Sequence, residues 1–166
     1  MLVKSYAAAV QGISATVVTI EVNCTKGIQF FLVGLPDVAV RESHERIISA
    51  LQVSGYKFPR NRIVINMAPA DIRKEGSSYD LPLAIGILAA AEELDASRLG
   101  HYMMMGELSL DGSLKPVKGI LPIAIKAREE GFKGFIVPKQ NAREAAVVND
   151  LDVYGLSLIH ISEPTR

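Results

Sequence analysis

The chain has 166 residues, of which 49% are hydrophobic, and these values fit one domain that can bury its own core without disulfides or a structural metal. Its 18 basic and 18 acidic residues cancel, which argues against a free-standing nucleic-acid binder. The sequence shows no signal peptide and no apolar run of the roughly 18 residues that a transmembrane helix needs, so we expect a soluble, cytoplasmic protein without a membrane partner.

The first segments are typical of strands. Val, Ile, Ala and Thr alternate locally over residues 4–24 and predict strands there. Turn residues follow at 25–27, and the apolar run 28–33 then predicts a strand that returns as a hairpin. Cys24 is the single cysteine and has no Cys or His at a ligand-like spacing, so we interpret it as a small strand residue in a reducing compartment.

A helix is predicted after Gly34. Asp37 is placed to cap its start and Gly55 to end it. Its apolar side has helical spacing and consists of Val40, Ile47, Ile48 and Leu51. The opposite face carries two oppositely charged pairs at i,i+4, which are Arg41 with Glu45 and Glu42 with Arg46. A buried strand is expected next, at residues 62–67.

The second half of the chain alternates helices with short strands. A polar loop at 68–78 leads to a helix at 80–94 that is apolar nearly all round, so we expect it in the centre of the domain, with Pro82 tolerated in its first turn. The remaining elements are a strand at 102–105, an Asp111-Gly112 hairpin, a helix at 119–130, a strand at 135–138, a helix at 141–148 and a strand at 153–154. This order predicts an α/β (α+β) sandwich with helices packed on a mixed sheet.

One segment, residues 74–78, has residue types suited to catalysis. It places serine hydroxyls at the start of a buried helix, where free amides and the helix dipole favour negative charge, so a nucleophilic serine with an oxyanion hole could be built there. The alternative is that Ser77, Ser78 or Asp80 merely caps the helix. The sequence contains no Gly-x-x-x-x-Gly-Lys-Ser/Thr motif, so we expect no ATP hydrolysis and no cofactor in this chain.

The other chemically interesting residues have structural interpretations. His44 and His101 lack a second histidine or carboxylate at ligand spacing, so no metal site is predicted. The Met run at 103–105 is interpreted as core filling. Three glycines are interpreted as turn residues, namely Gly106, Gly112 and Gly119.

Two long motifs carry a family resemblance. Residues 33–46 read VGLPDVAVRESHER, and residues 66–82 read NMAPADIRKEGSSYDLP. They resemble the amino-terminal domain of the ComM/YifB family of magnesium-chelatase-like AAA+ ATPases, and the resemblance covers residues 1–155. It implies a fold like the proteolytic domain of Lon and the second domain of ribosomal protein S-five. It also implies an AAA+ module beyond residue 155 that uses ATP and Mg, forms a ring and acts on DNA.

The resemblance further implies which residues a Lon-type site would use. Lon-type proteases activate a serine with a lysine base. In the matching motifs Ser78 stands at the serine position and Leu121 at the lysine position, and leucine accepts no proton. Lys118 lies about one helical turn earlier. We therefore expect no catalytic residue, with a serine peptidase that uses Ser78 and Lys118 as the alternative.

The expected function is a non-catalytic accessory domain that helps to assemble a ring-shaped ATPase or contacts its DNA or protein partner. For the parent protein, the resemblance implies branch migration of DNA during transformation or recombination. The candidate partner-contact residues are charged or polar and are Arg41, Glu42, Glu45, Arg46, Arg73, Lys74, Ser77 and Asp80.

The last eleven residues resemble a translated DNA adapter sequence. Residues 156–166, LSLIHISEPTR, match the translation of a transposase-type sequencing adapter, and we expect them to be non-native. His160 would then carry no chemistry, and the gene would continue past Gly155. The alternative is a genuine strand and loop.

Overall fold

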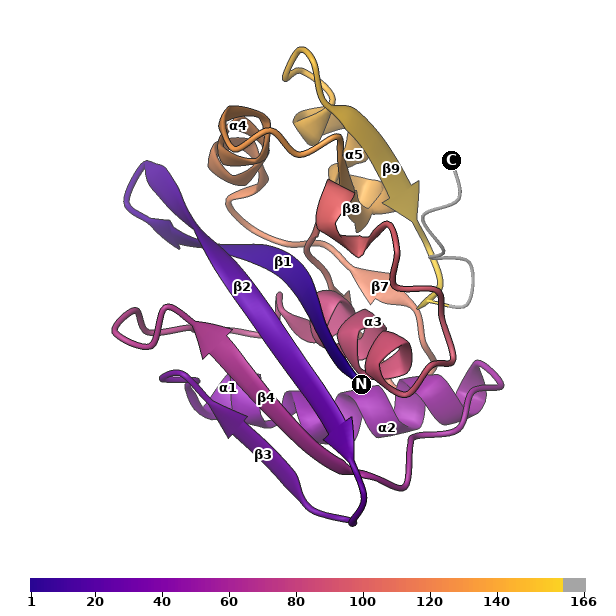
Figure 1. Ribbon diagram of the computed structural model, residues 1–166. Helices are drawn as coiled ribbons and strands as arrows, with labels where there is room; N and C mark the ends of the chain where they lie inside the picture. The colour runs from indigo at the N-terminus through magenta and orange to yellow at the C-terminus, as the bar shows by residue number, and fades with distance from the viewer. Residues whose placement is uncertain (160–166) are drawn as a thin grey trace.

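A four-stranded sheet is built from the first half of the chain (Figure 1). Strands β1 (Leu2–Gln11) and β2 (Ser14–Thr25) form a long hairpin, and the sheet order is β1-β2-β4-β3. Strand β4 (Arg62–Ala68) is antiparallel to β2, and β3 (Phe30–Val33) is parallel to β4. This computed structural model describes residues 1–159.

The predicted hairpin between β2 and the strand at 28–33 is wrong. Strand β4 lies between them, with Val22 of β2 and Leu32 of β3 on opposite sides of Ile65. Parallel strands need a crossover connection, and the helices between β3 and β4 supply it. The strongly alternating β4 buries Ile63, Ile65 and Met67 and takes the inner position, which leaves the half-exposed β3 at the edge.

The first helical region contains two helices where one was predicted. Helix α1 (Val38–Arg41) is capped by Asp37, whose Oδ1 accepts from the Val40 amide at 2.8 Å, and α2 (Ser43–Val53) follows after Glu42. The predicted apolar side is inward at Val40, Ile47 and Leu51 and half-buried at Ile48. Gly55 follows the helix with a φ of +89°, as its predicted role requires.

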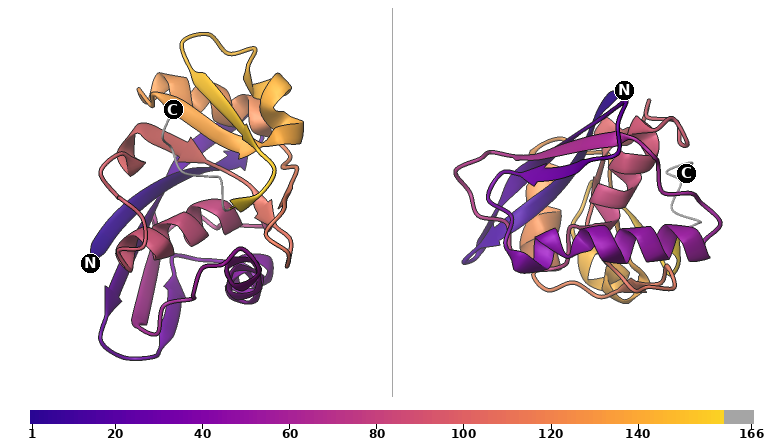
Figure 2. Two further views of the ribbon diagram at one scale, coloured as in Figure 1. Left: turned by 90° about the vertical axis from the view of Figure 1, so that its right-hand side faces the viewer. Right: turned by 90° about the horizontal axis from the view of Figure 1, so that it is seen from below.

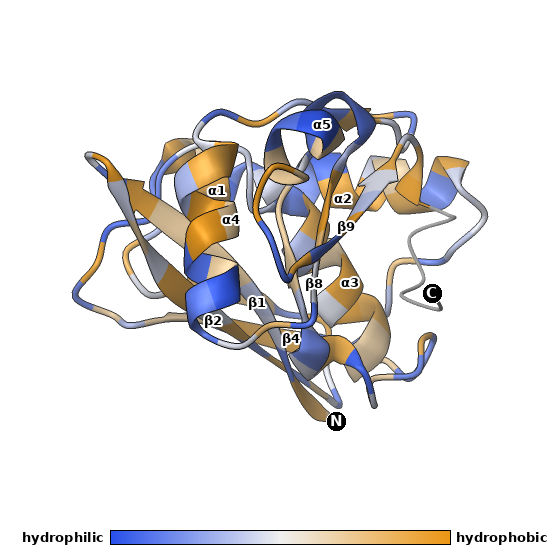
Figure 3. Cartoon of the chain, turned by 90° about the horizontal axis from the view of Figure 1, so that it is seen from above, coloured by the Kyte–Doolittle hydropathy of each residue, from blue (hydrophilic) through white to orange (hydrophobic). Residues whose placement is uncertain are grey.

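Helix α3 (Asp80–Ala90) is the centre of the domain, as predicted, although it ends before residue 94. Every residue in it is buried, and it lies against β1 and β2 (Figure 2). Its apolar colouring contrasts with the polar α5 in Figure 3. Gly86 allows the close approach, because a Cβ there would lie 2.9 Å from Val22 Cγ2. The Ser5 hydroxyl donates to the Pro82 carbonyl at 2.9 Å and ties β1 to the helix.

The second half of the chain has the predicted order of elements but more than one sheet. A parallel sheet contains β5, β8 and β9 in that order, and β6 and β7 form the predicted hairpin. The elements are η1 (Leu99–His101), β5 (Tyr102–Met104), β6 (Glu107–Leu108), β7 (Leu114–Lys115), α4 (Ile120–Glu129), β8 (Gly134–Pro138), η2 (Lys139–Asn141), α5 (Ala142–Ala145) and β9 (Asp152–Leu156). The α+β class is therefore confirmed, and residues 1–159 form three sheets in place of the single mixed sheet.

The final described residues pack on the β6–β7 hairpin. The Leu114 amide donates to the Ser157 carbonyl at 2.9 Å, and the Ile159 amide donates to the Gly112 carbonyl at 2.9 Å. The adapter origin of residues 156–166 stays a prediction, and His160 lies outside the described residues. Within residues 1–159, no helix has the length and apolar character needed to cross a membrane.

Candidate functional site

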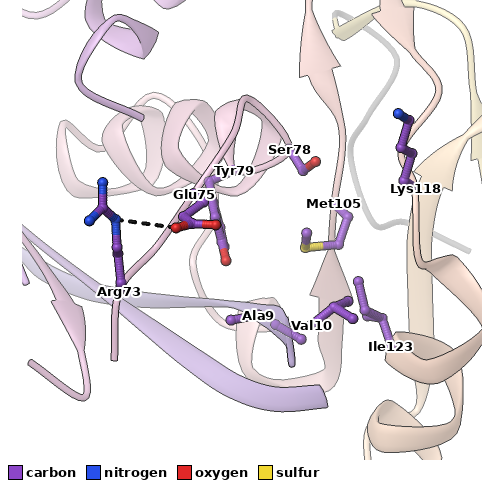
Figure 4. Close-up of a pocket in the computed structure, with 10 residues that line it drawn as sticks. Ala9, Val10, Arg73, Glu75, Ser78, Tyr79, Met105, Lys118 and Ile123 are labelled. Atoms are coloured by element: carbon purple, nitrogen blue, oxygen red, sulfur yellow. Dashed lines mark ion pairs between the residues drawn. The ribbon is translucent and has the colours of Figure 1, made fainter. Parts of the chain in front are cut away.

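A pocket of about 230 Å³ lies beside the start of α3 (Figure 4). It brings together the two residues of the peptidase alternative, Ser78 before α3 and Lys118 before α4. The lining also includes backbone and side chains of β1, the buried Tyr79, and charged residues of the preceding loop. The full lining is Ala8, Ala9, Val10, Arg73, Glu75, Ser78, Tyr79, Met105, Lys118 and Ile123.

The serine and the lysine share the pocket without forming a dyad. Within residues 1–159, no hydrogen bond joins the Ser78 hydroxyl to Lys118, and Lys118 is exposed. Leu121, at the position where the resemblance places the lysine of Lon, is 36% exposed on α4 and is absent from the lining. Among residues 1–159, no side chain that could act as a base is hydrogen-bonded to the Ser78 hydroxyl.

The amides of Asp80, Leu81 and Leu83 in the first turn of α3 are engaged, whereas the sequence suggested free amides there. The Asp80 amide donates to the Ser77 carbonyl at 3.3 Å, and the Leu81 amide donates to the Gly106 carbonyl at 3.0 Å. Pro82 has no amide hydrogen, and the Leu83 amide donates to the Tyr79 carbonyl at 3.0 Å. These donors are therefore already used and cannot stabilise an oxyanion.

The predicted cap of α3 by a serine or aspartate side chain is also wrong. Tyr79 is the N-cap residue and makes no side-chain capping bond. The Ser77 hydroxyl instead donates to Glu107, and the Gly106 amide donates to the Ser78 carbonyl at 2.8 Å. The chain around Gly106 thus covers the start of the helix, which the local sequence could not indicate.

Asp80 and Arg46 form a largely buried ion pair, which replaces the predicted Glu42–Arg46 pair. Arg46 Nε lies 2.7 Å from Asp80 Oδ2, and Arg46 Nη2 lies 2.9 Å from Oδ1. The Leu108 amide also donates to Asp80 at 3.0 Å. The hydrogen bond to Asp80 raises the pKa of Arg46, whereas burial raises the pKa of Asp80 against the opposing effect of Arg46. The pair joins α2, α3 and β6.

Lys74 is fully buried and anchors the loop before α3. Its ammonium donates to the carbonyls of Gly34, at 2.7 Å, and Pro69. Its backbone amide donates to the Leu35 carbonyl at 3.0 Å, and its carbonyl accepts from the Asp37 amide at 2.9 Å. Desolvation lowers the pKa of Lys74. The expected place of Lys74 and Asp80 on an exposed contact surface is therefore corrected, because both side chains lie inside.

The remaining candidate contact residues include an exposed group at α1 and the start of α2. Arg41, Glu42 and Glu45 are exposed there. Sequence reasoning missed two exposed apolar neighbours, Leu35 at 53% and Val38 at 72% exposure. Leu35 has a φ of +59°, which a non-glycine residue adopts at a cost, and such strain is often kept at functional surfaces. The one signal in the sequence was the position of Val38 outside the apolar face of the helix.

Arg73 and Ser77 complete the candidate set on the loop before α3. Arg73 is exposed and pairs with Glu75 at 3.2 Å, as Figure 4 shows. Ser77 is half-buried and is held by Glu107. Arg73 also lines the pocket, whereas Ser77 does not.

Three further titratable residues have pKa values shifted by burial, namely His44, Cys24 and Tyr79. The His44 ring stacks on Phe30 at 3.9 Å between centroids, and burial lowers its pKa. Burial raises the pKa of the Cys24 thiol on β2 and also that of Tyr79, so the Tyr79 hydroxyl stays neutral. In the described part of the chain, His, Cys, Asp and Glu form no group of three or more that could hold a metal.

A family model described as subunit ChlI of Mg-chelatase matches residues 20–141. The competence protein ComM of Haemophilus influenzae is 47% identical over 150 residues, covering 90% of this chain and 29% of that protein. The protein YifB of Escherichia coli is 45% identical over 139 residues, covering 83% of this chain and 27% of that protein.

A more distant match is Lon protease 2 of Bacillus subtilis, which is 30% identical over 119 residues, covering 72% of this chain and 20% of that protease. The chain thus spans less than a third of the length of the curated relatives it matches.

Proposed function

We propose, from the premise that this chain belongs to the ChlI family of Mg-chelatase-like AAA+ proteins together with ComM and YifB, that it is a non-catalytic accessory domain of a ring-forming ATPase. The ATPase would bind ATP and Mg and act on DNA, in branch migration during transformation or recombination. The similarity to a competence protein supports a DNA substrate. The gene beyond the codon for Gly155 should then encode a Walker A motif.

The absence of a base beside Ser78 carries the non-catalytic part of the proposal. A serine hydroxyl is a weak nucleophile until a base in hydrogen-bond contact accepts its proton. Among the residues described, Ser78 has no such partner, and the first-turn amides of α3 are already engaged. The domain can then bind a partner or support the ring, but it does not activate the Ser78 hydroxyl.

A serine peptidase is the second candidate, because one pocket holds both Ser78 and Lys118 and because Lon protease 2 is a relative. We expect fluorescein-labelled casein incubated with the 166-residue chain to be cleaved no faster than with its Ser78→Ala variant. Lys118→Met serves as the second variant and Ser77→Ala as the control. Cleavage that depends on both Ser78 and Lys118, and not on Ser77, would replace the accessory function with the peptidase.

The exposed group at α1 is the proposed ring contact. Leu35 and Val38 supply apolar area, and Arg41, Glu42 and Glu45 supply a charged rim, which is the composition of a protein interface. In the protein encoded by the whole gene, Val38→Asp combined with Arg41→Glu should weaken ring assembly at least about tenfold, as loss of an interface hot spot does. Analytical ultracentrifugation measures this. Arg143→Glu, on the exposed surface of α5, should leave assembly unchanged.

A further inference from the structure

Four basic residues gather at one end of the four-stranded sheet, although the chain as a whole is neutral. Lys26, Lys57 and Arg60 are exposed and Arg62 is half-buried. The sequence has no Asp or Glu over residues 22–36 or 47–70, so the segments that build this end carry only positive charge. Together with two exposed apolar neighbours these residues form a surface that we call the basic tip, whose members are Lys26, Ile28, Phe31, Lys57, Arg60 and Arg62.

Backbone and side-chain contacts hold these segments side by side. The Asn61 side chain donates to the Thr25 carbonyl at 3.2 Å, and Thr25 is paired with Arg62 in the sheet. Gly27 lies directly against Arg62, because a Cβ on Gly27 would be 2.9 Å from Arg62 Cβ. Phe58, in the segment before β4, packs against Phe30 of β3 with ring centroids 6.4 Å apart. These contacts place the members of the basic tip at the same end of the sheet.

An aromatic ring stands among these charges. Phe31 is 43% exposed on the edge strand β3, and the Arg62 guanidinium lies 5.3 Å from its ring centroid. Ile28, in the loop before β3, is 85% exposed. Cationic groups that follow a phosphate backbone, together with a ring on which a base can stack, are the features by which proteins bind single-stranded nucleic acid.

We propose that the basic tip binds single-stranded DNA. The cations neutralise phosphates, while Phe31 and Arg62 provide a stacking platform for a base. The choice of DNA strand over an acidic protein rests on the exposed ring beside the guanidinium, which a carboxylate-rich partner would not need. This inference rests on the proposed function and deepens it, since it gives the accessory domain its own contact with the substrate of the ring.

Fluorescence anisotropy of a labelled oligothymidylate of about 30 nucleotides, titrated with the 166-residue chain, tests the proposal. Four phosphate contacts predict a dissociation constant that rises about 50-fold between about 50 and 200 mM NaCl. Lys57→Ala with Arg60→Ala should weaken binding roughly tenfold and reduce the salt dependence. Phe31→Ala should weaken single-strand binding by a similar factor and leave binding to a duplex of the same length almost unchanged.

The matched control removes two exposed cations elsewhere, by Arg128→Ala with Arg143→Ala, on the helices α4 and α5 at the far end of the molecule in Figures 1 and 2. It should bind like the original chain. The proposal is overturned if the control weakens binding as much as Lys57→Ala with Arg60→Ala, if no salt-dependent binding occurs, or if polyglutamate competes as well as the oligonucleotide. Ring assembly is measured separately, so failure here leaves the accessory proposal standing.

Discussion

Replacing Asp80 with alanine is expected to lower the free energy of unfolding by about 3–5 kcal/mol, because the change leaves Arg46 inside without its carboxylate. The side chains of Arg46 and Asp80 are only 20% and 1% exposed, so water can replace few of the lost contacts. The Leu108 amide loses its acceptor as well. Urea unfolding followed by circular dichroism gives the value.

An exposed ion pair in the same region provides the control. Arg73 and Glu75 lie 3.2 Å apart with both side chains mostly exposed, so Arg73→Ala should cost less than about 1 kcal/mol. The double variant Asp80→Ala with Arg46→Ala should be less destabilised than the sum of its single changes, because it leaves no unpaired charge. Equal losses for Asp80→Ala and Arg73→Ala would show that the junction of α2, α3 and β6 does not depend on the pair.

Much of the fold could be predicted because its signals are local. An all-apolar run marks the central α3, alternation marks β4, and Asp37 and Gly55 mark the limits of a helical region. The pairing of the strands was harder to predict from the sequence. The turn at residues 25–27 favoured a hairpin, but β2 and β3 are not neighbours. Strand β4, which lies far along the chain, pairs with both of them and separates them.

The candidate site shows the same division between local and distant contacts. The sequence placed Ser78 at the start of a buried helix, and the structure confirms that position. The sequence alone could not show that the Leu81 amide donates to the Gly106 carbonyl, or that the Asp80 side chain is buried against Arg46. Arg41 and Arg46 look alike in sequence but differ in role. Arg41 is exposed, whereas Arg46 pairs with Asp80 at the junction of α2, α3 and β6.

Gly34→Ala is expected to lower the free energy of unfolding by about 3 kcal/mol or more, because the added methyl group would clash with the backbone of β4. Gly34 has a φ of +104°, and a Cβ there would lie 2.2 Å from the Met67 carbonyl oxygen and 2.9 Å from the Met67 carbonyl carbon. These are backbone atoms of the inner strand β4, so relief requires β4 or the loop to move. The Gly34 carbonyl also accepts from Lys74, so movement would disturb that buried ammonium as well.

Gly55→Ala separates the two causes of this loss. Gly55 has a φ of +89°, but a Cβ added there would meet no atom within 4 Å, so its alanine variant should lose only about 1 kcal/mol, from the left-handed backbone. The excess for Gly34→Ala, read from urea unfolding of both variants, is then the cost of the close approach to Met67. Equal losses would mean that backbone conformation alone requires glycine at position 34, and that the loop carrying Lys74 can shift from β4 without penalty.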